Sequence, residues 1–438
     1  NDKKFLNQLH GWLWSPEGFP YFQNENAGFL PVNNSDKIKK ESLIWNKLAS
    51  NNISVGILGS IHSSKYSKDI IGNQNYKFYL PDCFSGDNFA KPQEYKFFQS
   101  LNNLLVGQSG RVTDLKNLLR YLFNYSFKIL RRPRKFGISF FSLKIIISII
   151  YNYIICLNKE FLRMAQFPLI ASIYTDLLVK HQPAYSSLFS NHVAGNMHRY
   201  WYAHSPNSFK FKKQYSRKWI ERNKRSIFMG IDYVDDYLGF ILKKREFKNS
   251  IILITSSMGQ EANPNFGDKK LSKYDPKIKN MSLFLKYLSN FQKKELGESV
   301  EFIYCRNMWP QYGLKVKNKN NINLKIILES ISNFITTLGF TCKVDQEEES
   351  IVFTLNKDSI FENKYTIKEA KKKFSKYGFE FVPIEDHHSG SHCEDGSMIV
   401  INTSQRFDNS INKFKEQNGA INYLNFYRII TDYFQIRT

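Results

Sequence analysis

Histidines gather in two short segments that lie far apart in the sequence. The first segment, residues 183–206, holds three histidines beside a Tyr-Trp-Tyr run, and the second, residues 385–396, holds three more among acidic residues. Because the chain has only 9 histidines, this clustering favours one shared pocket over scattered surface loops. The competing interpretation is structural: His192 and His198 bond to nearby backbone groups while Trp201 and Tyr202 fill a core.

Apolar runs predict the elements that position these histidines. Residues 53–58, 184–189 and 251–255 are typical of short buried strands, and helical patterns separate them. We therefore expect an α/β fold with a mainly parallel central sheet and helices on both faces. Ligands of open α/β sheets bind at the carboxyl ends of strands, where His192, His198 and Ser257 would fall.

These motifs, taken in order, resemble the alkaline phosphatase superfamily, and within it the type I phosphodiesterase and nucleotide pyrophosphatase branch. The resemblance covers most of the chain and rests on SLIWNKLASNNISVGILGS, FYLPDCFSGDNFAKP, the first histidine motif with its His-Arg-Tyr-Trp, a strand ending in SSMGQ, and a late His392-x3-Gly396. It implies an alkaline-phosphatase-like core over residues 1–309 that resumes over 378–438. The intervening residues 310–377 are the least core-like and predict a small inserted α+β subdomain.

The resemblance also implies two divalent cations held by six side chains. His198 matches the histidine of an Asp-x3-His pair and His392 matches the late histidine, but Ala194, Ser257 and Met258 stand where three other ligands belong. Neither alanine nor a thioether offers such a cation a suitable lone pair. We therefore expect no intact dinuclear site and identify no nucleophile. A rebuilt site for one zinc or manganese ion remains an alternative, with ligands drawn from His192, His198, Asp386, His387, His388, His392 and Glu394.

The resulting hypothesis is a divergent phosphodiesterase- or sulfatase-like protein that binds a small phosphorylated or sulfated ligand, with reduced or altered catalysis. The ligand-binding residues expected on this hypothesis are His192, His198, Arg199, Ser257 and His392. Two alternatives are an active metal-dependent phosphoester hydrolase with a rebuilt site, and a non-catalytic binding or scaffold protein at a membrane surface.

Charge and hydropathy single out one further segment. The formal net charge is +23, but lysines are spread along the chain, which favours a solvated basic surface over a nucleic-acid partner. Residues 128–135, KILRRPRK, are an exception, because a nearly apolar run follows them to residue 158. This run predicts a buried helix, with an interfacial membrane helix or a span as alternatives, so residues 128–158 are a candidate membrane-surface contact.

The cysteines and the N-terminus bear on location. The five cysteines have no paired spacing, so we expect no disulfide framework. Without a targeting segment, a cytoplasmic location is the expectation. The chain opens at Asn1 without the first strand that the resemblance implies, so a truncated N-terminus is a further expectation.

Overall fold

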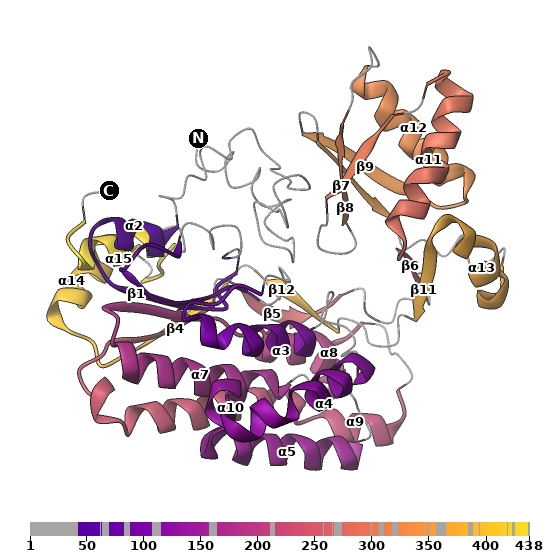
Figure 1. Cartoon of the computed structure of the whole chain (residues 1–438). Helices are drawn as coiled ribbons and strands as arrows, with labels where there is room; N and C mark the ends of the chain where they lie inside the picture. Colours follow the sequence, from indigo (N-terminus) through magenta and orange to yellow (C-terminus); the bar gives the residue numbers. More distant parts are fainter. Residues whose placement is uncertain are drawn as a thin grey trace. The chain divides into compact units, whose positions relative to one another are not determined.

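The structure is a computed structural model of the whole chain, with the element arrangement drawn in Figure 1. It describes residues 43–61, 63, 70–82, 88–106, 115–156, 164–210, 215–256, 258–264, 266, 274–298, 300–305, 311–317, 323–347, 350–355, 365–383, 389–393, 395–417, 419–422 and 425–436.

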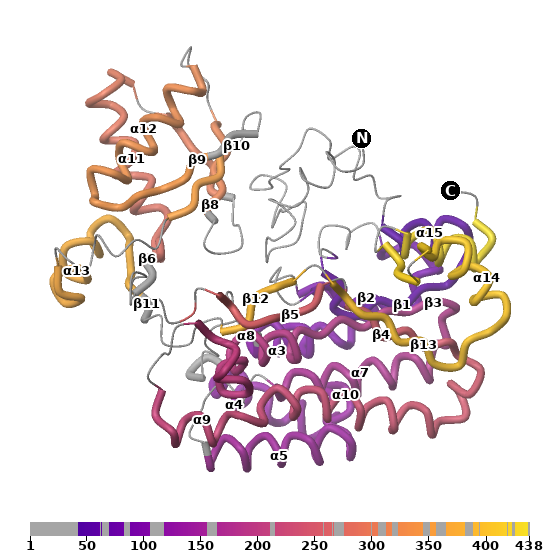
Figure 2. Tube along the Cα trace, turned by 180° about the vertical axis from the view of Figure 1, so that it is seen from behind, coloured from indigo at the N-terminus to yellow at the C-terminus, as the bar shows by residue number. Residues whose placement is uncertain are grey.

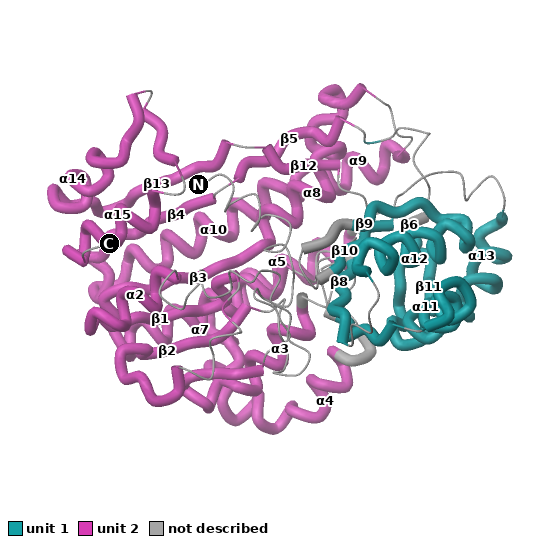
Figure 3. The backbone as a smooth tube through the Cα atoms, turned by 90° about the horizontal axis from the view of Figure 1, so that it is seen from above, with its two compact units in different colours: residues 1–35, 211–213, 265–387 teal, residues 36–210, 214–264, 388–438 magenta. Residues whose placement is uncertain are grey.

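The chain divides into two compact units, coloured separately in Figure 3. The larger unit is built on residues 36–210, 214–264 and 388–438, and the smaller unit on residues 265–387. The smaller unit is thus an insertion within the larger one. It contains the whole range 310–377 that the sequence assigned to a subdomain, together with flanking elements on both sides.

Three short strands of the larger unit form a parallel sheet in the order β2-β1-β3. They are β1 (Val55–Leu58), β2 (Tyr76–Leu80) and β3 (Tyr185–Leu188). Side chains alternate across the sheet because successive residues of a strand point to opposite faces. β1 lies within the predicted strand run 53–58, and β3 lies within the predicted run 184–189.

A hydrophobic core lies on each face of this sheet, and Figures 1 and 2 show helices on both sides of it. On one face Val55 and Ile57 pack with residues of α2 (Ile44–Ser50), α14 (Gln405–Phe414) and α15 (Asn425–Tyr433). On the other face, Leu58 joins a larger core. Its helices are α3 (Lys96–Val106), α4 (Leu115–Arg131), α5 (Phe140–Cys156), α7 (Gln166–His181) and α10 (Ser226–Leu242).

The other described strands of the larger unit form two separate antiparallel pairs. β4 (Ile252–Ser256) pairs with β13 (Ser397–Ile401), and β5 (Gly259–Ala262) pairs with β12 (Gly390–Cys393). The expected mainly parallel central sheet is therefore wrong for the described residues, in which only β1, β2 and β3 are parallel. The run 251–255 does form a strand, but it pairs with a segment that returns antiparallel after the inserted unit. An apolar run does not specify its hydrogen-bonding partner.

Two further helices and four short 3-10 turns complete the described part of the larger unit. These are α8 (His192–His204), α9 (Arg217–Asn223), η4 (Gln93–Tyr95), η5 (Pro133–Phe136), η6 (Pro206–Ser208) and η7 (Arg245–Phe247). The first of these, α8, supplies several of the candidate site residues.

The smaller unit is an α+β structure with its own core. An antiparallel sheet in the order β7-β8-β10-β9 packs against α11 and α12 through Phe284, Phe334 and Phe353. A separate antiparallel pair joins β6 and β11. The elements are β6 (Tyr274–Ile278), α11 (Met281–Leu296), β7 (Phe302–Cys305), β8 (Gln311–Val316), α12 (Leu324–Thr337), β9 (Cys342–Glu347), β10 (Ser350–Leu355), α13 (Ile367–Phe374), η9 (Ser375–Tyr377) and β11 (Phe379–Pro383).

The apolar segment that follows the basic cluster forms α5, and it is only half buried. Phe141, Ile145 and Ile149 belong to the core, whereas Phe140 and Ile147 are exposed. Across the described ranges, no helix has the length and apolar character needed to cross a membrane.

Gly56 offers a test of the packing between β1 and β2. A Cβ at position 56 would lie 2.2 Å from Cζ of Phe78, whose side chain is fully buried. We expect Gly56→Ala to lower the free energy of unfolding by about 1–3 kcal/mol, the usual cost of overpacking a core. Urea denaturation measures this change. Gly72→Ala is the control because nothing lies within 4 Å of its added Cβ, and equal destabilisation by both variants would contradict the packing.

Candidate functional site

The first histidine segment forms α8, which follows β3 after three residues. The helix determines which side chains can meet. His192 and His198 are six residues apart, a rotation of about 240° at 3.6 residues per turn, so they leave different sides of the helix. The two histidines therefore occupy different environments, although the sequence suggested one shared pocket for both.

The second histidine segment forms strand β12, which pairs with β5. In this register His392 lies directly opposite Gln260. Ser389 and Gly390 precede His392 and contact α8, and Gln260 of β5 also reaches this helix, so α8 packs against both strands of the pair. The pairing brings the late histidine motif beside β5, which begins directly after Met258.

His198 is held on both ring nitrogens. Its Nδ1 donates to the carbonyl oxygen of Gly390 over 2.9 Å, and Gln260 Nε2 lies 3.2 Å from its Nε2. A carbonyl only accepts, so the neutral ring carries its proton on Nδ1, and Nε2 accepts from the Gln260 amide. Gln260 Oε1 is buried and has no hydrogen-bond partner among the described residues.

His198 and His392 meet edge to face. Their ring centroids are 4.6 Å apart with an angle of 88° between the planes. The structure thus brings together the two residues on which the resemblance to metal-binding phosphodiesterases depends. His392 is exposed at this contact, whereas His198 is partly buried.

Ser389 and Gly390 connect β12 to α8 through hydrogen bonds and close backbone packing. The Ser389 hydroxyl lies 2.9 Å from the carbonyl oxygen of Arg199 and accepts from the backbone N–H of Tyr202. A Cβ on Gly390 would lie 2.5 Å from the carbonyl oxygen of Met197, so glycine allows the two backbones to approach closely. The Ser-Gly pair of the late motif therefore positions His392 through backbone contacts.

Partial desolvation by neighbouring groups lowers the pKa of both clustered histidines. For His198 desolvation is the largest cause and is opposed by its hydrogen bond to Gly390, while His392 and Arg199 lower the pKa further. For His392 desolvation again lowers the pKa, against a hydrogen bond to the Gly259 backbone. The neutral form of each imidazole is thus favoured relative to a solvated histidine.

His192 lies in the core and not in this cluster. It is buried, stacks on Phe167 with centroids 4.1 Å apart, and bonds to the Ser190 hydroxyl and the Gly230 carbonyl. Desolvation lowers its pKa to about 4. Both of its ring nitrogens are bonded within the protein at this position, and its expected role as a ligand-binding residue stays a prediction. The structural interpretation weighed for the sequence fits this histidine.

Arg199 follows His198 on α8, and one of its guanidinium nitrogens, Nη1, donates to the carbonyl oxygen of Gly195 over 3.1 Å. The remaining predicted site residues, Ser257, Asp386, His387 and His388, lie outside the described residues, as does Glu394.

Gln260 is the site residue that the sequence analysis missed. Its position two residues beyond Met258 was a usable signal, because alternate residues of an extended strand share a face.

The expectation of no intact dinuclear site stays a prediction, and several features of the described residues bear on it. Ala194 and Met258 supply no ligand of the required kind, and the lone pair of His198 Nε2 accepts a hydrogen bond from Gln260. Nor do the described residues contain a group of three or more His, Cys, Asp or Glu side chains that could hold a metal ion. The rebuilt mononuclear site depends on residues 386–388 and 394 and stays a prediction.

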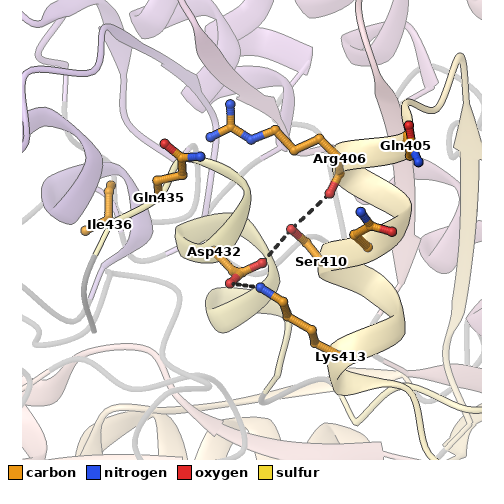
Figure 4. Close-up of a pocket in the computed structure, with 8 residues that line it drawn as sticks. Gln405, Arg406, Ser410, Lys413, Asp432, Gln435 and Ile436 are labelled. Atoms are coloured by element: carbon orange, nitrogen blue, oxygen red, sulfur yellow. Dashed lines mark hydrogen bonds and ion pairs between the residues drawn. The ribbon is translucent and has the colours of Figure 1, made fainter.

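Two hollows lie elsewhere in the larger unit. One, of about 600 Å³, lies between α14 and α15, where Asp432 bonds to Ser410 and Lys413 (Figure 4). Its wall is formed by Gln405, Arg406, Asn409, Ser410, Lys413, Asp432, Gln435 and Ile436. The other, of about 10 Å³, lies at the carboxyl ends of β1 and β3 and has room for about one water molecule. Neither hollow is lined by His198 or His392.

Comparisons of the chain with protein-family models, with curated proteins and with solved structures each found no match. The resemblance to the alkaline phosphatase superfamily therefore stays a prediction from the sequence motifs.

The environment of His192 predicts a pH-dependent stability. Because its folded pKa of about 4 lies below the ordinary value of 6.5, the unfolded chain binds more protons between these values. Stability should therefore fall as the pH drops from about 6.5 towards 4, by up to about 3 kcal/mol from this residue at 1.36 kcal/mol per pKa unit.

Urea denaturation of the parent and of His192→Gln at pH 7 and pH 4.5 tests this expectation. The variant should be less stable at pH 7 but should lose less stability on acidification. His204→Gln serves as the control, because His204 is half-buried on the same helix and contacts Phe228. An unchanged pH dependence in His192→Gln would contradict the assignment.

Proposed function

We propose that the chain binds a small phosphorylated or sulfated ligand at the cluster of His198, Arg199 and His392, and that its catalysis is reduced or altered relative to two-metal phosphodiesterases. On this proposal it is a divergent member of the alkaline phosphatase superfamily. The observation that carries the proposal is the contact between His198 and His392, which lie in distant motifs and whose rings meet at 4.6 Å.

Charge supports an anionic ligand. Arg199 adds a permanent cation with five donors next to His198 on α8, where its charge lowers the pKa of that imidazole, and planar guanidinium groups suit phosphate and sulfate oxygens. The excess of lysine and arginine over acidic residues raises the local concentration of small anions.

Binding of the anion should be coupled to proton uptake. In the neutral cluster the N–H of His198 is already donated to Gly390. Protonation would give Nε2 a proton as well, and rotation of the Gln260 amide would present its unpartnered Oε1 to accept that proton. An anion beside the cluster favours this charged state and so raises the pKa of the imidazoles.

The lost ligand positions support reduced catalysis. Ala194 and Met258 cannot replace the carboxylate and imidazole of the two-metal pattern, so the Lewis-acid stabilisation of a phosphoryl transition state is not supplied in the same way. The active hydrolase with a rebuilt site is the alternative that experiment must separate from simple binding.

Calorimetry with inorganic sulfate and with an aryl phosphate ester tests the proposal. For one coupled proton, affinity should rise by up to about tenfold per pH unit as the pH is lowered towards 6. His392→Gln and Arg199→Gln should each weaken binding at pH 6, whereas the control His204→Gln should bind like the parent. Binding that neither variant alters would place the ligand elsewhere.

Hydrolysis of the aryl phosphate ester is measured in the same samples. Turnover that a chelator abolishes and that His392→Gln removes would favour the rebuilt hydrolase. Absence of binding and of turnover would contradict both functions.

A further inference from the structure

Two helices of the larger unit present large apolar side chains to solvent. On α4 the exposed side chains are Leu119, Leu122, Phe123, Phe127 and Leu130, with Phe123 at 82% and Leu130 at 81% exposure. Their spacing of three and four residues places them on one face of the helix. This outer stripe is distinct from the stripe of Leu118, Tyr121 and Ile129 that packs into the core.

The outer face of α5 is also apolar. Its exposed residues include Phe140, Ile147, Ile150, Tyr151, Ile154 and Ile155, with Phe140 at 90% exposure. In Figures 1 and 2 this helix forms the outermost layer, beyond α10. Isolated exposed hydrophobic residues are ordinary, but two helices that each expose such a stripe indicate an interaction surface.

The inner face of α5 is fixed to the protein. Phe141 contacts Tyr237 and stacks on Phe240 of α10, and Ile145 and Ile149 lie in the core. A partner would therefore meet the outer face of α5 while the helix stays packed.

The charged side chains of α4, α5 and the segment between them are all of one sign. The sequence from residue 115 to 156 contains eight lysines and arginines and no aspartate or glutamate. Arg131, Arg132 and Arg134 are all exposed at the junction between α4 and α5. The aspartates of α10 mark the edge of this basic region, where Asp236 pairs with Lys144 at 3.5 Å.

We infer that the outer faces of α4 and α5 dock on an anionic lipid bilayer, with the apolar side chains inserted at the boundary of the headgroups and the arginines paired with lipid phosphates and carboxylates. Apolar insertion and attraction of basic residues to anionic lipid act together in interfacial helices. This inference does not depend on the proposed ligand site.

Charge favours a bilayer over a second copy of the chain. A symmetric dimer through this face would bring the same arginine-rich surface of two copies together, since two-fold interfaces are self-complementary. Like charges would then repel, whereas an anionic bilayer neutralises them.

Vesicle sedimentation with the full chain tests the inference. We expect binding to vesicles of mixed phosphatidylcholine and phosphatidylserine, weaker binding to phosphatidylcholine alone, and weakening by added salt of the binding to the mixed vesicles. The triple variant Phe123→Ser, Phe127→Ser and Leu130→Ser should lose most binding. A matched control places three serines at Ile71, Ile326 and Ile399, which are also exposed, and should bind like the parent.

Charge reversal separates the electrostatic contribution to vesicle binding from the contribution of apolar insertion. Arg131→Glu with Arg132→Glu should lower the partition coefficient by about fivefold or more for each residue. Lys368→Glu with Lys372→Glu changes the net charge equally at exposed positions of α13 and should have little effect. All substituted side chains are exposed, and circular dichroism confirms that the variants stay folded.

Three results would overturn the inference. One is the absence of binding to mixed vesicles, and another is binding that neither the apolar nor the charge variant reduces. The third is sedimentation equilibrium showing a dimer that the apolar triple variant dissociates, with no vesicle binding, because a second copy would then cover the face.

Discussion

The hydrogen bonds between α8 and residues 389–390 hold the candidate site together. Ser389 bonds to the backbone of α8 on one side, and the carbonyl oxygen of Gly390 accepts the Nδ1 proton of His198. These contacts fix where β12 begins, and the pairing of β12 with β5 then places His392 opposite Gln260. The arrangement of both histidines therefore depends on a close backbone approach that a side chain at position 390 would prevent.

One helix gives its histidines different roles because of how they are buried. His192 is fully paired in the core, and the cost of desolvating a charge keeps it neutral. His198 is also paired, but its partner is an amide that can rotate, and its neighbour is a second imidazole. The first arrangement stabilises the fold at neutral pH. The second leaves a group of neutral rings whose protonation an anion would favour.

The two faces of α5 also differ in burial. Its sequence is apolar all round, which is typical of a buried helix. One side of the helix is buried in the core through Phe141, Ile145 and Ile149. The other side is exposed and lies beside the basic junction between α4 and α5. A buried helix and a membrane-surface helix are thus not exclusive alternatives here, because the burial of one face orients the other.

The sequence by itself indicated the short strands at 53–58, 184–189 and 251–255 and the concentration of histidines in two motifs, because local periodicity and composition carry that information. It did not determine strand partners: β4 pairs antiparallel with β13, which follows the inserted unit. The sequence also left open which residues His192 and His198 would each contact. A helix at 192–204 turns His192 into the core and His198 towards β12, and only long-range packing decides which partner each residue finds.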